Sequence, residues 1–184
     1  MKPRLAPFLL LSLAACAAAP LVPARSDTPW PVARSAPAST PVQAPASITE
    51  MERQTHERIN RYRASRGLPP LAYNDAVAAI ARRHSEDMAA GRVPFGHQGF
   101  DQRSQAVGAA GVDQRSIAEN VHESSYPAES AVEVAVSGWL GSPGHLQNIV
   151  GAYDLTGIGV ARSPRGVWYF TQIFVGTRQP RRAG

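Results

Sequence analysis

Apolar residues recur every three or four positions in two stretches of the chain, which predicts two amphipathic helices. The first helix begins at the capping sequence Ser47-x-x-Glu50 and is stopped by Gly67 and the prolines that follow it. The second is capped by Asn74 and ends before Gly91. The residues expected to face inward are Ile48, Met51, Thr55, Ile59 and Tyr62 in the first helix, and Val77, Ile80, Ala81, His84 and Met88 in the second.

The pattern weakens after the second helix and then becomes helical again. Residues 91–116 are rich in Gly and polar residues and show no long period, so an irregular connection is expected there. Residues 117–121 favour a short strand. A third helix is predicted over residues 127–140, and the sequence Ser-Pro-Gly-His at 142–145 is expected to break it.

The C-terminal part of the domain predicts a β-hairpin. Residues 155–161 and 167–175 favour strands, and residues 163–166 form the turn between them. Both faces of the second strand are largely apolar, and a strand buried on two sides needs helices above and below it. The prediction is therefore an α+β domain built as a three-layer α-β-α sandwich.

The first 15 residues are predicted to be a lipoprotein export signal. Two basic residues precede an apolar run over residues 5–13, which is too short to span a bilayer. Leu13-Ala14-Ala15-Cys16 resembles a bacterial lipobox, in which the cysteine is acylated and becomes the mature N-terminus. The alternative is that Cys16 is an incidental small residue and cleavage follows residues 17–19.

Composition divides the remaining chain into a tether, a domain and a tail. Residues 16–47 are rich in Pro, Ala and Ser, which favours an extended spacer between a membrane anchor at Cys16 and the folded part. The domain is expected over residues 48–178, followed by a tail over residues 179–184. The protein is expected to be exported to the bacterial cell envelope and anchored there in a membrane as a lipoprotein, on the periplasmic or the cell-surface side.

Charge and cysteine usage exclude several kinds of function. Without residues 1–15 the chain keeps 17 basic residues against 14 acidic ones, and this weak excess does not favour a nucleic-acid partner. Lys2 is the one lysine in the sequence, so lysine-based covalent catalysis is excluded after cleavage of the signal. A single cysteine cannot form an intramolecular disulfide.

Three polar clusters carry the candidate chemistry. They are Gly96-His97-x-x-Phe100-x-x-Arg103, Ala118-Glu119-Asn120 and Ser142-Pro143-Gly144-His145-x-x-Asn148. Together they supply two imidazoles and a carboxylate, which with water could form an open zinc site. The alternative is that the three side chains only hydrogen-bond to neighbouring loops and hold a cleft in shape.

These clusters, taken in order with the helix and strand motifs around them, resemble one protein family. The further matching segments are Ile59-Asn60-x-Tyr62-Arg63, Ala81-x-x-His84-Ser85-x-Asp87-Met88, Trp139-x-x-Ser142, Ile158-Gly159-Val160 and Tyr169-x-x-Gln172-x-Phe174. The sequence from about residue 50 to 176 is similar to the bacterial branch of the CAP superfamily, named for cysteine-rich secretory proteins, antigen 5 and pathogenesis-related proteins, also called the SCP domain.

The resemblance implies an α-β-α sandwich with a cleft that holds two His and two Glu and can bind a divalent cation such as zinc. His97, Glu119 and His145 match three of the four residues. Ser142 stands where many relatives have the second Glu, so weak cation binding is expected. The resemblance also implies a lipid, peptide or cell-wall ligand for a binding module.

A metal- or serine-dependent, protease-like hydrolase that uses the same cleft is the alternative function. In its serine-dependent form Ser142 would be the nucleophile, His145 the base and Glu119 the residue that orients it. Ser142 lacks the Gly-x-Ser-x-Gly environment of an exposed nucleophile, which favours the binding module. A partial zinc-protease motif at His122 lacks its second histidine and is set aside.

Three further side chains are candidates for lining the cleft: Arg103, Asn148 and Gln172. The structural alternatives are that Arg103 bridges loops, Asn148 holds the turn after His145, and Gln172 is a buried amide. His84 lies on an apolar helix face, so a buried, hydrogen-bonded histidine is expected there.

Overall fold

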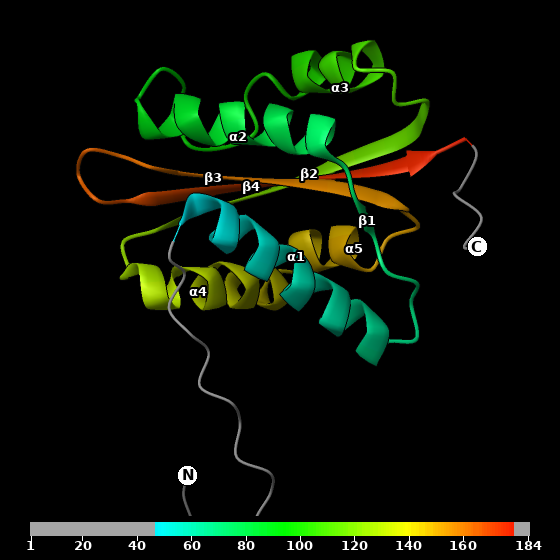
Figure 1. The fold of residues 1–184 in the computed structure, drawn as a ribbon, viewed down its shortest axis with the longest axis horizontal. Coiled ribbons are helices and arrows are strands. Elements are labelled where there is room, and N and C mark those ends of the chain that lie inside the picture. The colour runs from blue at the N-terminus through cyan, green and yellow to red at the C-terminus, as the bar shows by residue number, and fades with distance from the viewer. Residues whose placement is uncertain (1–46, 179–184) are drawn as a thin grey trace, which may run out of the picture. The chain divides into compact units, whose positions relative to one another are not determined.

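A computed structural model describes residues 47–178, and its helices lie on both faces of one four-stranded sheet (Figure 1). Helices α2 and α3 cover one face, and α1, α4 and α5 cover the other. The predicted three-layer α-β-α sandwich is confirmed. The elements are α1 (Ile48–Ser65), β1 (Ala72–Tyr73), α2 (Asp75–Ala89), α3 (Phe100–Ala109), β2 (Gln114–Ser124), α4 (Ala128–Gly141), α5 (Pro143–Ile149), β3 (Leu155–Arg162) and β4 (Trp168–Thr177).

Helix starts and the hairpin follow the sequence signals. The Ser47 hydroxyl accepts a hydrogen bond from the backbone N–H of Glu50, and the Asn74 side chain accepts one from Val77, so both predicted N-caps are confirmed. Strands β3 and β4 pair antiparallel across the predicted turn. Ile48, expected to face inward, is 40% exposed because it lies in the first turn of α1, beyond the edge of the core.

Two local predictions were wrong, and the predicted break after the third helix is confirmed but short. Residues 91–116 contain helix α3, whose signal is weak because Val107 alone among its residues is buried. The strand predicted at 117–121 extends over all of β2. The break after α4 is one residue long, because Pro143 begins α5 at a position where a missing N–H leaves no hydrogen bond unmade.

The sheet has the strand order β1-β3-β4-β2, so β2 is an edge strand beside β4. Two side chains satisfy backbone carbonyls on the free side of β2. Asn148 donates to the carbonyl of Glu119 at 3.3 Å, and the Trp139 indole N–H donates to the carbonyl of Val121 at 3.0 Å. These contacts occupy the middle of the edge.

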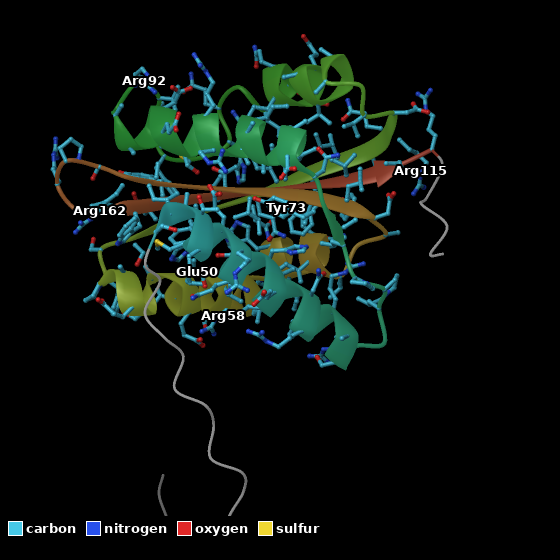
Figure 2. The ribbon with its side chains drawn as sticks, in the orientation of Figure 1. Glu50, Arg58, Tyr73, Arg92, Arg115 and Arg162 are labelled. Carbon is cyan, nitrogen blue, oxygen red and sulfur yellow. The ribbon has the colours of Figure 1, made fainter. Side chains whose placement is uncertain are left out.

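At the opposite edge of the sheet, β1 pairs with only the first two residues of β3. Side chains therefore bond the backbone groups of β3 beyond them. Further along, the hydroxyl of Tyr73, a residue labelled in Figure 2, donates to the carbonyl of Ile158 at 3.2 Å. The buried carboxylate of Glu52 accepts the backbone N–H of Val160 at 3.1 Å. Burial also raises the pKa of Tyr73 to about 12, so its hydroxyl stays a donor at any ordinary pH.

The two faces of the sheet are packed differently. Gly157 and Gly159 of β3 lie against the backbone of α2, where a Cβ on Gly159 would come within 2.0 Å of the Arg82 nitrogen. The other face carries large side chains, with Trp139, Phe170 and Phe174 fully buried among residues of α1 and α4. One helix layer therefore sits on small residues and the other on aromatic ones.

Outside the described residues lie the predicted signal, Cys16, most of the tether and the tail, which fall in residues 1–46 and 179–184. Their predictions stand as the sequence made them. Within residues 47–178, none of the helices has the length and apolar character needed to cross a bilayer.

Candidate functional site

Glu119 is the centre of a charged cluster on the α2 and α3 side of β2. Its side chain is 1% exposed, and it is bonded by two residues from the segment that follows α2. One carboxylate oxygen accepts from Nδ1 of His97 at 2.9 Å and from Nη2 of Arg103 at 2.7 Å. The other accepts from Nε of Arg103 at 2.6 Å. The buried negative charge is thus fully paired and hydrogen-bonded.

His97 is held by Glu119 in one tautomer. A carboxylate only accepts hydrogen bonds, so Nδ1 carries the proton and Nε2 keeps a free lone pair. The His97 side chain is 51% exposed, and Nε2 has no hydrogen-bond partner among residues 47–178. This histidine therefore presents a bare nitrogen to solvent, as a metal-binding or proton-accepting imidazole does.

Arg103 fixes the loop as well as the carboxylate. Besides Glu119 it donates to the carbonyl of Gln98 at 2.8 Å and to that of His97 at 3.4 Å. Gly99, with φ of +79°, makes the turn that brings this loop back to the start of α3. Arg103 therefore bridges loops, as the structural alternative proposed, and holds His97 in place.

The second half of the site lies on the other face of β2. Neighbouring residues of a strand point to opposite faces, so Asn120 faces α5 while Glu119 faces α3. Asn120 donates to the carbonyl of His145 at 3.1 Å and accepts from Asn148 at 2.9 Å. Asn148 thus ties α5 to the edge strand and does not hold a turn, because His145 lies within the helix.

His97 and the backbone of His145 are bonded to adjacent residues of β2, Glu119 and Asn120, from opposite faces of the sheet. Burial, followed by the nearby charge of His97, lowers the pKa of His145. All three clusters are therefore bonded to the same part of β2, and the formation of one site by the side chains of His97, Glu119 and His145 stays a prediction.

Glu119 does not orient His145. Its two oxygens are taken by His97 and Arg103, and Ser142 makes no side-chain hydrogen bond at the start of α5. The relay expected for a hydrolase, from Ser142 through His145 to Glu119, is absent from the described residues. The physical reason is the alternation of β2, which turns Glu119 away from α5.

Gln172 lies in the core and does not line an open cleft. It is 0% exposed, and its amide N–H₂ donates to the hydroxyl of Thr156 at 3.1 Å. Its oxygen has no partner within residues 47–178. His84 is likewise buried and bonded to the carbonyl of Gly96, as its apolar surroundings predict.

His122 was set aside as a partial zinc-protease motif, but the structure places it on the same face of β2 as Asn120. Two residues after Asn120, it points to the same face, and its ring packs against Gly138 of α4, where an added Cβ would come within 2.9 Å. Burial and the charge of His145 lower its pKa. Alternation from Asn120 would have placed His122 beside the site without any metal-binding motif.

The described residues contain no cluster of three or more His, Cys, Asp or Glu side chains arranged to hold a metal ion. Glu119 is already saturated, so its position suits a carboxylate that supports a ligating histidine better than a ligand itself. Two imidazoles remain, His97 and His145, and imidazole nitrogen suits zinc, copper and nickel.

The fold and the matched segment define the class of this protein. Residues 56–174 match the model of the cysteine-rich secretory protein family, so the chain belongs to the CAP family. The resemblance inferred from the motifs is confirmed.

Two curated relatives come from Bacillus subtilis (strain 168). The chain is 30% identical over 141 residues to the uncharacterized protein YkwD, and 30% identical over 130 residues to the uncharacterized membrane protein YlbC. These matches cover 75% and 69% of this chain but 52% and 35% of the relatives. The chain thus spans about half, or less, of their length.

Solved structures show the same fold. An extracellular SCP-domain protein from Bacillus anthracis str. Ames matches with a TM-score of 0.57 and 25% identity, covering 76% of this chain and 45% of that one. An outer surface protein from Borrelia burgdorferi matches with a TM-score of 0.59 and 15% identity, covering 72% and 96%.

Proposed function

We propose that this protein is an exported binding module of the CAP family, in which His97 and His145 form a weak site for a divalent cation such as zinc. The observation that carries the proposal is the bond from Nδ1 of His97 to buried Glu119, which leaves Nε2 bare on a half-exposed ring. A carboxylate behind a histidine raises the basicity of the ligand nitrogen and fixes its direction.

Two protein ligands would leave a bound cation with open coordination positions. Zinc prefers four ligands, so water or an atom of a lipid, peptide or cell-wall ligand would complete the sphere. The missing second carboxylate at Ser142 and the engagement of Glu119 with Arg103 both reduce the negative charge available to the cation. Weak binding follows from the same residues.

Calorimetric zinc titration tests this site. We expect binding to the intact protein and at least about a tenfold loss in His97→Ala or His145→Ala. Glu119→Gln should weaken binding by about 10- to 100-fold, as the loss of a supporting carboxylate does elsewhere. The matched control is Glu123→Gln, an exposed residue on the same strand and face. Titrations unchanged by all three site variants would refute the proposal.

The location is proposed from the N-terminal sequence and supported by the relatives. The sequence has the form of a lipobox at Leu13-Ala14-Ala15-Cys16. One protein of similar structure is described as extracellular, and another as an outer surface protein. We expect the mature protein to begin at an acylated Cys16 and to partition with membranes. Mass spectrometry of the mature N-terminus checks this, and an unmodified start after residue 16 would contradict it.

A further inference from the structure

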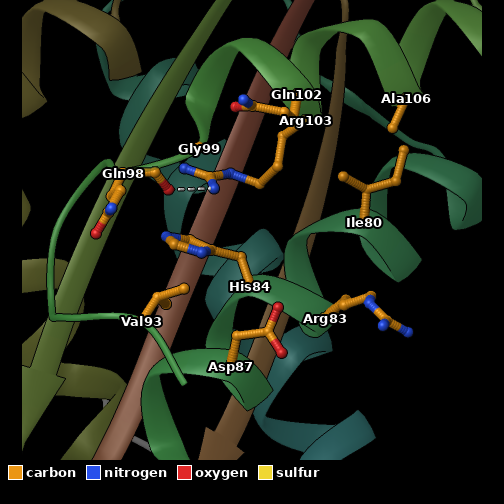
Figure 3. A pocket seen from close by; sticks show the side chains of 10 residues that line it. All are labelled: Ile80, Arg83, His84, Asp87, Val93, Gln98, Gly99, Gln102, Arg103 and Ala106. Atoms are coloured by element: carbon orange, nitrogen blue, oxygen red, sulfur yellow. Dashed lines mark hydrogen bonds between the residues drawn. The ribbon is translucent and has the colours of Figure 1, made fainter. Parts of the chain in front are cut away.

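A pocket of about 300 Å³ lies between α2, the loop before α3, and α3 itself (Figure 3). Its walls are mostly apolar and include Ile80, Val93 and Ala106. The volume is at the lower end of the range for small-molecule sites. The pocket shares Arg103 with the candidate cation site but none of its histidines.

His84 gives this pocket a fixed hydrogen-bond acceptor. The residue is 3% exposed, and its Nε2 is 2.9 Å from the carbonyl oxygen of Gly96. A carbonyl cannot donate, so Nε2 carries the proton and Nδ1 is a bare acceptor. Within residues 47–178 Nδ1 has no partner, yet it is not one of the polar atoms sealed from solvent. Burial lowers the pKa of His84, which keeps the ring neutral.

Arg103 gives the pocket a donor next to that acceptor. A guanidinium has five N–H groups. Four of them are used by Glu119 and by the carbonyls of His97 and Gln98, which leaves one N–H on Nη1. The guanidinium and the His84 ring lie beside each other at one end of the pocket, and their proximity contributes to the lowered pKa of His84 (Figure 3).

The ionic groups around the pocket favour a neutral ligand. Arg103 is paired with Glu119, and Asp87 is paired with Arg92 at 2.6 Å. Arg83 lies at the rim with its guanidinium directed away from the other lining side chains in Figure 3. A ligand with a net charge would therefore find no free partner of opposite sign inside.

We infer that this pocket binds the acetamido group of an N-acetylated amino sugar. A secondary amide has one N–H to donate to Nδ1 of His84 and one carbonyl to accept from Nη1 of Arg103, and its methyl group suits the apolar walls. The exposed side chains of Gln98 and Gln102, which make no hydrogen bonds within the described part of the chain, stand at the mouth for sugar hydroxyls. This inference does not depend on the cation site.

The test is a titration of the full chain with N-acetylglucosamine, in which ¹H–¹⁵N NMR spectra are recorded at each step. We expect saturable shifts at Gly99, Gln102 and Ala106 with a dissociation constant of about 1 mM, as a ligand of this size allows. Glucose, which lacks the acetamido group, should bind at least about tenfold more weakly, because both amide hydrogen bonds are lost. Equal binding of the two sugars, or shifts confined to other residues, would overturn the inference.

Three variants separate the pocket from general stability. Ala106→Leu fills the pocket from the exposed side of α3 and should weaken N-acetylglucosamine binding by at least about tenfold. Ala109→Leu, on the same helix but outside the pocket, should leave the affinity within about twofold. His84→Phe should match Ala106→Leu, since it keeps an aromatic side chain but removes the Nδ1 acceptor, together with the Nε2 hydrogen bond to the Gly96 carbonyl.

A peptide amide and zinc provide the remaining arms. N-acetylalanine methylamide offers the same amide without a sugar and should bind more weakly than N-acetylglucosamine; tighter or equal binding would overturn the sugar assignment. Zinc affinity should be unchanged in Ala106→Leu. That result would show that the two sites are independent, so the proposal for one site can be refuted without the other.

Discussion

The two faces of the sheet are built on opposite packing principles. On one face Gly157 and Gly159 let the backbone of α2 approach the strand directly, while on the other Trp139, Phe170 and Phe174 fill a thick aromatic layer. At these two glycines the first face has no room for an added Cβ atom. The stability of the second face depends on the volume that its large side chains fill. The candidate site uses both, because its two histidines are positioned from different faces.

The largest expected effect tests the glycine face. In Gly159→Ala the new Cβ would lie 2.0 Å from the Arg82 nitrogen and 2.3 Å from the Ala81 carbonyl carbon, so α2 must move as a whole. We expect a loss above the usual range for overpacking, about 3 kcal/mol or more in the free energy of unfolding. Urea denaturation measures it.

The matched control is Gly141→Ala. Gly141 ends α4 with nothing within 4 Å of an added Cβ, so alanine should be neutral or slightly stabilising. Similar stability of the two variants would show that α2 does not rest on the strand backbone.

The second prediction concerns the ion pair on the glycine face. Arg103→Gln leaves the Glu119 carboxylate, which is 1% exposed, without its bidentate partner. Removing one member of a buried pair costs about 3 kcal/mol, because the remaining charge is uncompensated. We expect lower stability in urea together with weaker zinc binding at His97. A stability loss with zinc affinity intact would show that Arg103 does not position the histidine.

The third prediction tests the aromatic face. Trp139→Phe removes volume from the core and the indole N–H that bonds the carbonyl of Val121. We expect a loss of about 2 kcal/mol in the free energy of unfolding, below that of Gly159→Ala. Thermal and urea unfolding check the order, and the reverse order would contradict the comparison of the faces.

The smallest effect is on pH dependence. The pKa values of His84 on one face and His122 on the other are lowered by burial from an ordinary value of 6.5. Unfolding lets them bind protons that the native state excludes, so their stabilising contribution is present above about pH 6.5 and is lost as the pH falls towards the native pKa values. The urea concentration at the unfolding midpoint should therefore fall as the pH is lowered from 7.5 to 5. The fall should be less steep in His122→Asn.

The sequence predicted the layers well because burial leaves a periodic signal. The apolar hairpin and the capped helices α1 and α2 were readable from residue spacing and end signals. Helix α3 was missed since only Val107 is buried on it, and β1 was missed because two residues make no pattern.

The candidate site was predicted as a meeting of residues but not as a set of bonds. His97, Glu119 and His145 were identified from motifs. Both oxygens of Glu119 are bonded by Arg103. The spacing of residues in the sequence does not predict that the Arg103 side chain extends from α3 to Glu119. The alternation of β2 was readable, and applied to Glu119 and Asn120 it would have excluded the relay to His145.

The side chains that satisfy both rims of the sheet bear on how copies of this protein behave when crowded. An open strand edge is a template for strands from other molecules. Here Asn148 and Trp139 occupy the carbonyls of β2, and Tyr73 and Glu52 occupy the groups of β3 beyond β1. The middle of each edge therefore offers no continuous row of free backbone groups to a strand from another molecule.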